Sequence, residues 1–137
     1  MASVFQLEIV APDRKFYEGE ADMVIVRTLE GDLGILKGHL DYVAPLDIGV
    51  VKIKKDGHYK EATIAGGFVQ IGKEKVTILT DAAEWPGEID LDRAKKAKDH
   101  AEEEMRKGPK DETYVLFAEL KLKRALNRIR MAEHNEK

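Results

Sequence analysis

The residues best suited to bind a ligand occupy positions 89–94, where a helix is predicted to begin. The segment reads Ile-Asp-Leu-Asp-Arg-Ala, and its Asp90, Arg93 and Ala94 share one helix face because they lie three and four residues apart. A helix N-terminus offers free backbone N–H groups, and an arginine guanidinium suits a phosphate or a planar base. The segment therefore has the chemistry of a nucleotide-binding site.

Two further arginines belong to the last predicted helix. Arg124 and Arg128 are four residues apart and lie on one face. If this helix folds back antiparallel on the first, its C-terminal half approaches Arg93. The three arginines and the acid of the motif would then converge on a small apolar floor of Ile89 and Ala94, which suits a nucleoside triphosphate. The alternative is that the acid only caps the helix and the arginines form a solvated face.

Other catalytic chemistry finds little support in the composition. The absence of cysteine excludes disulfides, thiolate metal sites and cysteine nucleophiles, and the single serine is Ser3. The four histidines have no metal-binding spacing. The glycine-rich stretch 31–38 lacks the pattern of a phosphate-binding loop, so we expect a structured loop whose glycines adopt positive φ. Nothing here indicates a free-standing enzyme.

Charge and hydropathy exclude two further classes. The chain has 137 residues, with 23 basic and 26 acidic side chains and a net charge of −3. This near balance argues against a nucleic-acid-binding protein. No apolar run approaches the roughly 20 residues needed to cross a bilayer, and the N-terminus does not read as a signal peptide. We therefore expect a cytoplasmic protein without direct membrane insertion, which reaches a membrane only through partners.

The elements that must position these residues fall into two parts. Apolar and polar residues alternate over the first 85 positions, and Asp56-Gly57 is a strong hairpin signal. This pattern predicts an antiparallel β-sandwich over 1–86. Glycine and proline are then absent over 90–107 and 112–133, which predicts two helices, the first capped by Asp90. The expected class is α+β, with a helical hairpin over 87–137.

The apolar stripes of the two helices are narrow. The first stripe is Leu91, Ala94, Ala97, Ala101 and Met105. The second is a heptad seam of Val115, Ala118, Leu122, Ala125, Ile129 and Ala132, which we expect Leu116, Leu120 and Leu126 to widen. Two such helices bury too little area to be stable alone. The hairpin must therefore lie on the β domain, lie on a partner, or alternate between them.

Three motifs carry a resemblance to a known family. The stretches Gly31–His39, Ala65–Val69 and Val76–Asp81, followed by a helical hairpin, resemble the bacterial epsilon subunit of F-type ATP synthase. The resemblance implies a noncatalytic rotor subunit that joins the gamma subunit to the c-ring at the cytoplasmic face of the membrane. It also implies helices that are compact on the sandwich or extend into the alpha/beta catalytic hexamer, where they inhibit ATP hydrolysis. The implied rotor-contact loop includes Gly31, Gly34, Gly38 and His39.

The same resemblance implies regulation by ATP. Some bacterial members bind ATP through an Ile/Leu-Asp-x-x-Arg-Ala motif, which 89–94 matches fully. The implied ligand set is Glu84, Ile89, Asp90, Arg93, Ala94, Arg124 and Arg128. ATP would favour the compact state, and the resemblance leaves open whether Mg²⁺ accompanies it. The chain departs from the family pattern at His100, where an arginine is expected, and at Lys37, where proline is usual.

Two other functions remain as alternatives. The first is a β-sandwich interaction module whose hairpin docks an unrelated partner through the Val115–Ala132 seam. The second is an enzyme that hydrolyses nucleotides, which is disfavoured because no general base or metal set is evident near the motif.

Overall fold

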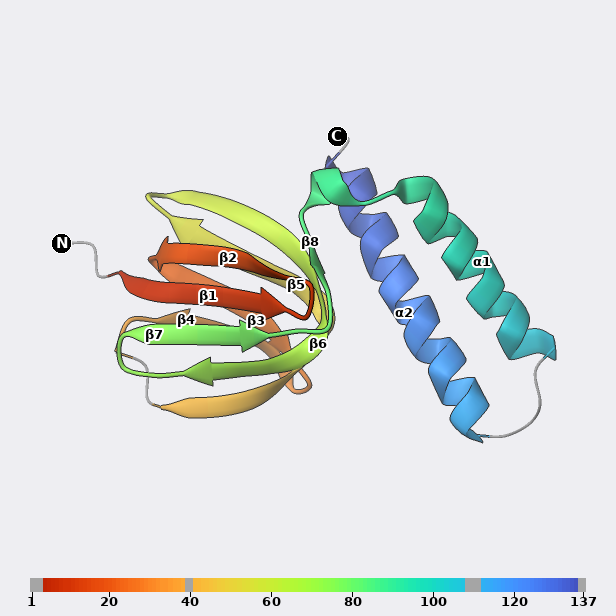
Figure 1. Ribbon diagram of the computed structural model, residues 1–137, viewed down its shortest axis with the longest axis horizontal. Coiled ribbons are helices and arrows are strands. Elements are labelled where there is room, and N and C mark those ends of the chain that lie inside the picture. Colours follow the sequence, from red (N-terminus) through yellow and green to blue (C-terminus); the bar gives the residue numbers. More distant parts are fainter. Residues whose placement is uncertain (1–3, 39–40, 108–111, 136–137) are drawn as a thin grey trace. The chain divides into compact units, whose positions relative to one another are not determined.

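The computed structural model describes residues 4–38, 41–107 and 112–135, and it divides the chain into two compact units, 1–85 and 86–137. The first, the β unit, is all strands, and the second, the helical unit, is a pair of helices preceded by one 3-10 turn (Figure 1). The predicted α+β class, a β-sandwich followed by two helices, is confirmed.

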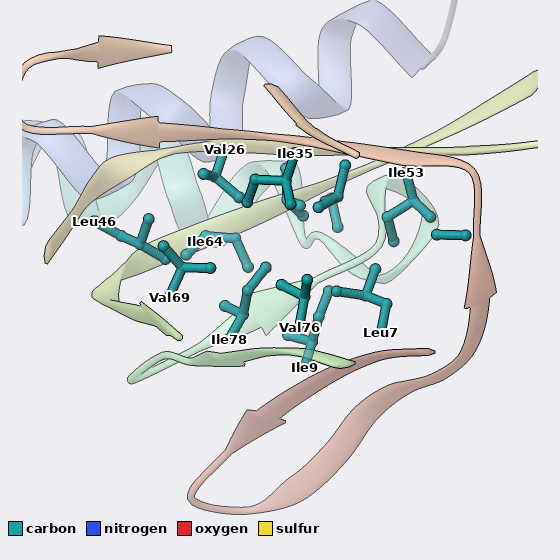
Figure 2. Packing of buried hydrophobic residues seen from close by; sticks show 14 of the residues in the cluster. Leu7, Ile9, Val26, Ile35, Leu46, Ile53, Ile64, Val69, Val76 and Ile78 are labelled. Atoms are coloured by element: carbon teal, nitrogen blue, oxygen red, sulfur yellow. The ribbon is translucent and has the colours of Figure 1, made fainter. Parts of the chain in front are cut away.

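The β unit is a single curved sheet whose two halves face a shared core (Figures 1 and 2). Its order is β2-β1-β7-β6-β5-β3-β4, with β8 paired to β6. Among the described strands one pairing, β1 with β7, is parallel, and the others are antiparallel. The strands are β1 (Phe5–Ala11), β2 (Arg14–Ala21), β3 (Met23–Thr28), β4 (Gly31–Leu36), β5 (Tyr42–Lys55), β6 (His58–Ile71), β7 (Lys75–Leu79) and β8 (Ala83–Glu84).

Branched aliphatic side chains fill the core of the β unit (Figure 2). In β1 the predicted alternation is confirmed, because Phe5, Leu7 and Ile9 are buried while the residues between them face outward. The largest fully buried side chains come from six different strands: Leu7, Ile9, Ile35, Ile53, Ile78, Val24, Val26, Val51 and Val69. A core drawn from so many strands makes the unit a rigid platform.

Two glycine-containing segments behave differently from each other. Asp56 and Gly57 have φ of 52° and 79° and join β5 to β6, which confirms the predicted hairpin. The expected loop over 31–38 is wrong for most of its length, since Gly31–Leu36 forms strand β4, paired with β3. Its side chains alternate, with Ile35 buried in the core, and backbone pairing with β3 overrides the glycine content.

The helical unit contains η1 (Pro86–Glu88), α1 (Leu91–Lys107) and α2 (Glu112–Asn135), and the two long helices form an antiparallel hairpin (Figure 1). The predicted cap is confirmed, because the backbone N–H of Arg93 donates to Oδ1 of Asp90 at 3.0 Å. No helix in the described part of the chain is both long and apolar enough to cross a membrane.

Most of the buried residues of the two helices are alanines. Ala94 and Ala101 are buried on α1, and Ala118, Ala125 and Ala132 are buried on α2. Each of these small side chains buries less apolar area than a leucine or isoleucine in its place would bury.

Two expectations about these stripes are wrong. Ala97 is exposed, and the half-buried Lys98 takes its place, which gives α1 a regular spacing of 91, 94, 98, 101 and 105. Leu116, Leu120 and Leu126 do not widen the seam of α2, because their exposed fractions are 55%, 37% and 38%. A seam built largely from alanines is narrow, so side chains one or two positions away along α2 do not reach the partner helix.

Candidate functional sites

The motif at 89–94 forms the start of α1. Ile89 is half-buried, and its backbone N–H donates to the Pro86 carbonyl at 3.3 Å. Ala94 is 3% exposed and supplies the predicted small apolar surface. The side chains of Asp90 and Arg93 are exposed at the positive end of the helix. The structure therefore shows the cap and leaves the guanidinium of Arg93 accessible to a ligand.

One contact between the helices shows which part of α1 lies beside the arginines of α2. Nζ of Lys121 lies 3.5 Å from Oε2 of Glu104. Because the helices are antiparallel, residues that follow Lys121 in α2 lie beside residues that precede Glu104 in α1. Of the two arginines on α2, Arg128 is the one nearer Arg93 along the hairpin.

The two arginines of α2 are less exposed than Arg93. Arg124 and Arg128 are both half-buried, and Nε of Arg124 is fully shielded from solvent. The two arginines of α2 are thus partly covered by neighbouring side chains, whereas Arg93 is exposed.

A polar network joins the two helices, and sequence reasoning found only one of its members, His100. Nε2 of His100 lies 2.8 Å from Oε1 of Glu104, whose other oxygen faces Lys121. Glu104 thus connects a residue of α1 with a residue of α2, and its side chain is only 19% exposed. Asn127 was also missed, although it is 6% exposed and adjoins Arg128. The signal that could have found Glu104 and Asn127 is a polar residue at a helix position that neighbouring side chains cover.

The remaining implied residues belong to the β unit. Glu84 lies in β8 and is half-buried, and its backbone carbonyl accepts a hydrogen bond from Oγ1 of Thr63 at 3.3 Å. In the implied rotor-contact loop, Gly31 and Gly38 have φ of 125° and 82°. Gly34 pairs with Ile25 inside β4 and is exposed. The prediction for His39 falls outside the described residues.

An exposed apolar row crosses three neighbouring strands of the β unit, which sequence reasoning also missed. Pro45 pairs with Phe68, and Phe68 pairs with Leu79, so the three side chains share one face of the sheet. Phe68 and Leu79 are 55% and 50% exposed, and Val43, two residues from Pro45, is 61% exposed. This outer apolar row is suited to contact another protein.

Within 4–38, 41–107 and 112–135, no group of three or more acidic or histidine side chains could hold a metal ion.

Comparison with known families accounts for both units. Residues 4–86 match the family described as "ATP synthase, Delta/Epsilon chain, beta-sandwich domain", and residues 88–133 match "ATP synthase, Delta/Epsilon chain, long alpha-helix domain". The chain belongs to the ATP synthase delta/epsilon family. Members of this family are stalk subunits of ATP synthase and are not themselves catalytic, so this family member is a subunit and not an enzyme.

Curated relatives of this delta/epsilon chain are similar over almost its whole length. It is 50% identical over 134 residues to the ATP synthase epsilon chain of Alkaliphilus metalliredigens, covering 98% of this chain and 99% of that one. It is 48% identical to the epsilon chain of Caldanaerobacter subterraneus subsp. tengcongensis, with 96% of each chain covered. These relatives confirm the resemblance to the bacterial epsilon subunit.

Solved structures agree with the family. The delta/epsilon chain resembles a chain of the Euglena gracilis mitochondrial ATP synthase, in a structure of its OSCP, F1 and c-ring, with a TM-score of 0.80 and 25% identity, covering 96% of this chain and 82% of that one. A chain from the central stalk and c-ring of Tetrahymena thermophila mitochondrial ATP synthase shares the fold, with a TM-score of 0.65 and 14% identity, covering 97% and 96%.

Proposed function

We propose that this delta/epsilon chain couples the gamma subunit to the c-ring in the central stalk of a proton-translocating ATP synthase, at the cytoplasmic face of the cell membrane. The observation that carries the proposal is that its two units match, in order, the two domains of one stalk-subunit family. The outer apolar row supports binding of the gamma subunit, because Phe68 and Leu79 are large, exposed and adjacent. The segment from Gly31 to Gly38 would supply contacts to the c-ring.

Regulation is assigned to the helical unit. The alanine seam buries little area, so a rearrangement of the helices costs little compared with unfolding the β core. Helix α2 also leaves Leu116 and Phe117 exposed by 55% and 61%, with Leu120 one turn further along. This apolar surface would dock against the alpha/beta catalytic hexamer in the extended form and inhibit ATP hydrolysis.

ATP is the proposed regulatory ligand that favours the compact state. The motif at 89–94 supports a triphosphate site on the hairpin. Arg128 lies nearer Arg93 along the hairpin than Arg124 does, and both arginines would contribute to the site. The family resemblance adds Glu84 from the β unit, and Glu84→Gln tests its contribution separately. Titration calorimetry of the full chain with ATP, with and without Mg²⁺, is expected to show saturable binding of one nucleotide per chain.

Arginine variants locate the ATP site. Arg93→Ala is expected to weaken ATP binding at least about tenfold, which corresponds to about 1.4 kcal/mol. Arg106→Ala, an exposed position near the other end of α1, is the matched control and should leave affinity unchanged. Equal affinities in the two variants would remove Arg93 from the site. Binding unaffected by Mg²⁺ would show that the protein's own cations neutralise the phosphates.

Assembly is tested apart from ATP. Phe68→Asp is expected to abolish copurification with the gamma subunit, because a buried, unpaired carboxylate is costly in an apolar interface. Tyr59→Asp changes an aromatic residue that is 50% exposed in the same strand and should leave assembly intact. If the wild-type chain fails to copurify with gamma, the alternative of an interaction module with another partner takes its place.

A further inference from the structure

Aromatic contacts hold the last residue of the β unit. The ring of Trp85 stacks on Phe16, with centroids 4.5 Å apart and planes inclined by 26°. Tyr17 meets the same indole edge-on, at 6.4 Å between centroids. Phe16 is 7% exposed and belongs to the main core, and Trp85 packs against that core. The indole is therefore bound to the platform by two neighbouring residues of β2.

Arg14 secures the backbone just before this tryptophan. Its Nη2 donates to the Ala83 carbonyl at 3.1 Å, and its guanidinium lies 4.9 Å from the centre of the Phe16 ring. Backbone pairing adds to this contact, because β8 pairs with Thr63 and Ile64 of β6. The Ala65 N–H donates to the Ala82 carbonyl at 3.0 Å. Residues 82–85 are thus fixed by both side chains and backbone.

The chain changes unit immediately after this point. The β unit ends at Trp85 and the helical unit begins at Pro86, within η1, which packs against α2. Gly87 has no positive φ, and a Cβ there would meet nothing within 4 Å. Neither a left-handed backbone conformation nor steric crowding requires glycine at this position. Glycine therefore contributes only its greater backbone flexibility here.

We propose that Trp85, held by Arg14, Phe16 and Tyr17, is the anchor at which the β unit fixes the end of its chain, so that the helical unit pivots at the junction that directly follows Trp85. The rearrangement itself rests on the proposed function, but the anchor does not. With the anchor intact, Glu84 keeps its place on the β unit while the helices move. Without it, 83–85 become part of that junction, whose reach grows by up to about 10 Å.

The distance between the units measures the anchor directly. The chain has no cysteine, so spin labels can be placed on the full chain at Lys73→Cys and Lys95→Cys, both exposed. In the absence of ATP, Trp85→Leu is expected to broaden the distance distribution by up to about 10 Å. It should also speed amide exchange at Ala65 at least tenfold. Trp85→Phe retains an aromatic ring and should stay close to the wild type.

A matched control and a milder variant complete the test. Tyr59→Leu makes the same kind of change at an aromatic residue whose ring contacts Lys54, and it should not broaden the distribution. Arg14→Met removes the hydrogen bond to Ala83 without removing an aromatic core residue, so it decides the matter if Trp85→Leu unfolds the β unit. A wild-type distribution in a folded Trp85→Leu or Arg14→Met chain would overturn the anchor.

The same labels separate the anchor from the proposed regulation. Addition of ATP to the wild-type chain tests whether nucleotide shifts the mean distance, which is a result about the proposed function. The width of the distribution without ATP reports the anchor alone. Acrylamide quenching of Trp85, the chain's single tryptophan, gives a second reading: shielding supports the anchor, and quenching as strong as that of free tryptophan contradicts it.

Discussion

The cores of the two units differ in the side chains that build them. The β unit buries leucine, isoleucine and valine from six strands, whereas the helical unit buries alanines together with Asn127 and Met131. Full burial of a large aliphatic side chain contributes about 1.5–3 kcal/mol, but a methyl group contributes only about 0.8 kcal/mol. The buried side chains of the β unit consequently contribute more to its folding free energy than those of the helical unit contribute to theirs.

Single-residue changes sharpen this comparison, because each unit has its own spectroscopic probe. Trp85 reports the β unit, and ellipticity at 222 nm reports the helices. Unfolding of the two units can therefore be followed separately in urea.

The largest effect is expected at Gly67, where strands β6 and β7 approach closely. A Cβ on Gly67 would lie 1.8 Å from the Leu79 carbonyl oxygen, and its φ of +118° disfavours any other residue. Gly67→Ala should lower the stability of the β unit by about 4 kcal/mol, measured by Trp85 fluorescence in urea. Gly57→Ala, with φ of +79° and open space, isolates the backbone strain and should cost only about 1 kcal/mol.

Truncation of a buried side chain tests the contrast between the cores. Leu7 is fully buried, and Leu7→Ala should destabilise the β unit by about 3 kcal/mol. On the hairpin, Ala118→Gly should lower helix stability by about 1 kcal/mol, chiefly through helix propensity. Urea titrations followed by the two probes check both values. Equal costs would mean that the hairpin is as tightly packed as the sandwich.

Enlargement of a helix residue distinguishes the seam from the surface. Ala101 is 0% exposed, so Ala101→Leu should separate the helices and cost about 2 kcal/mol of helical stability. Ala97 lies one turn away but is exposed, and Ala97→Leu should change stability by less than about 0.5 kcal/mol. Thermal melts followed at 222 nm compare the two variants. A larger loss of stability in Ala97→Leu than in Ala101→Leu would show that Ala97 lies in the seam.

The smallest expected effect is electrostatic. A hydrogen bond from Lys107, at 2.9 Å, together with its charge lowers the pKa of the Glu103 carboxyl below its ordinary value. The pair therefore stabilises α1 above that ordinary value, and the contribution disappears as the pH falls through the lowered pKa. Glu103→Gln should lower the melting temperature of the helices slightly at pH 7 but not at pH 2. High salt should reduce the difference, because the pair is exposed.

Several local features follow from neighbouring residues alone and were predictable. The hairpin at Asp56-Gly57 needs only its own turn chemistry, and the Asp90 cap needs only the N–H of Arg93. Heptad spacing predicted the buried alanines of α2, which are Ala118, Ala125 and Ala132, but not the buried Asn127 and Met131. The family motif at 89–94 is likewise a property of consecutive residues, which is why this part of the candidate site could be named before the structure.

Tertiary structure decided the features that join distant segments. Strand β4 forms in a glycine-rich stretch because β3 pairs with it, and Lys98 replaces Ala97 in the seam because α2 sets which face of α1 is covered. The Trp85–Phe16 stack and the Lys121–Glu104 contact join residues far apart in sequence. No local periodicity encodes such pairings, since they depend on which backbone groups and side chains the complete fold brings together.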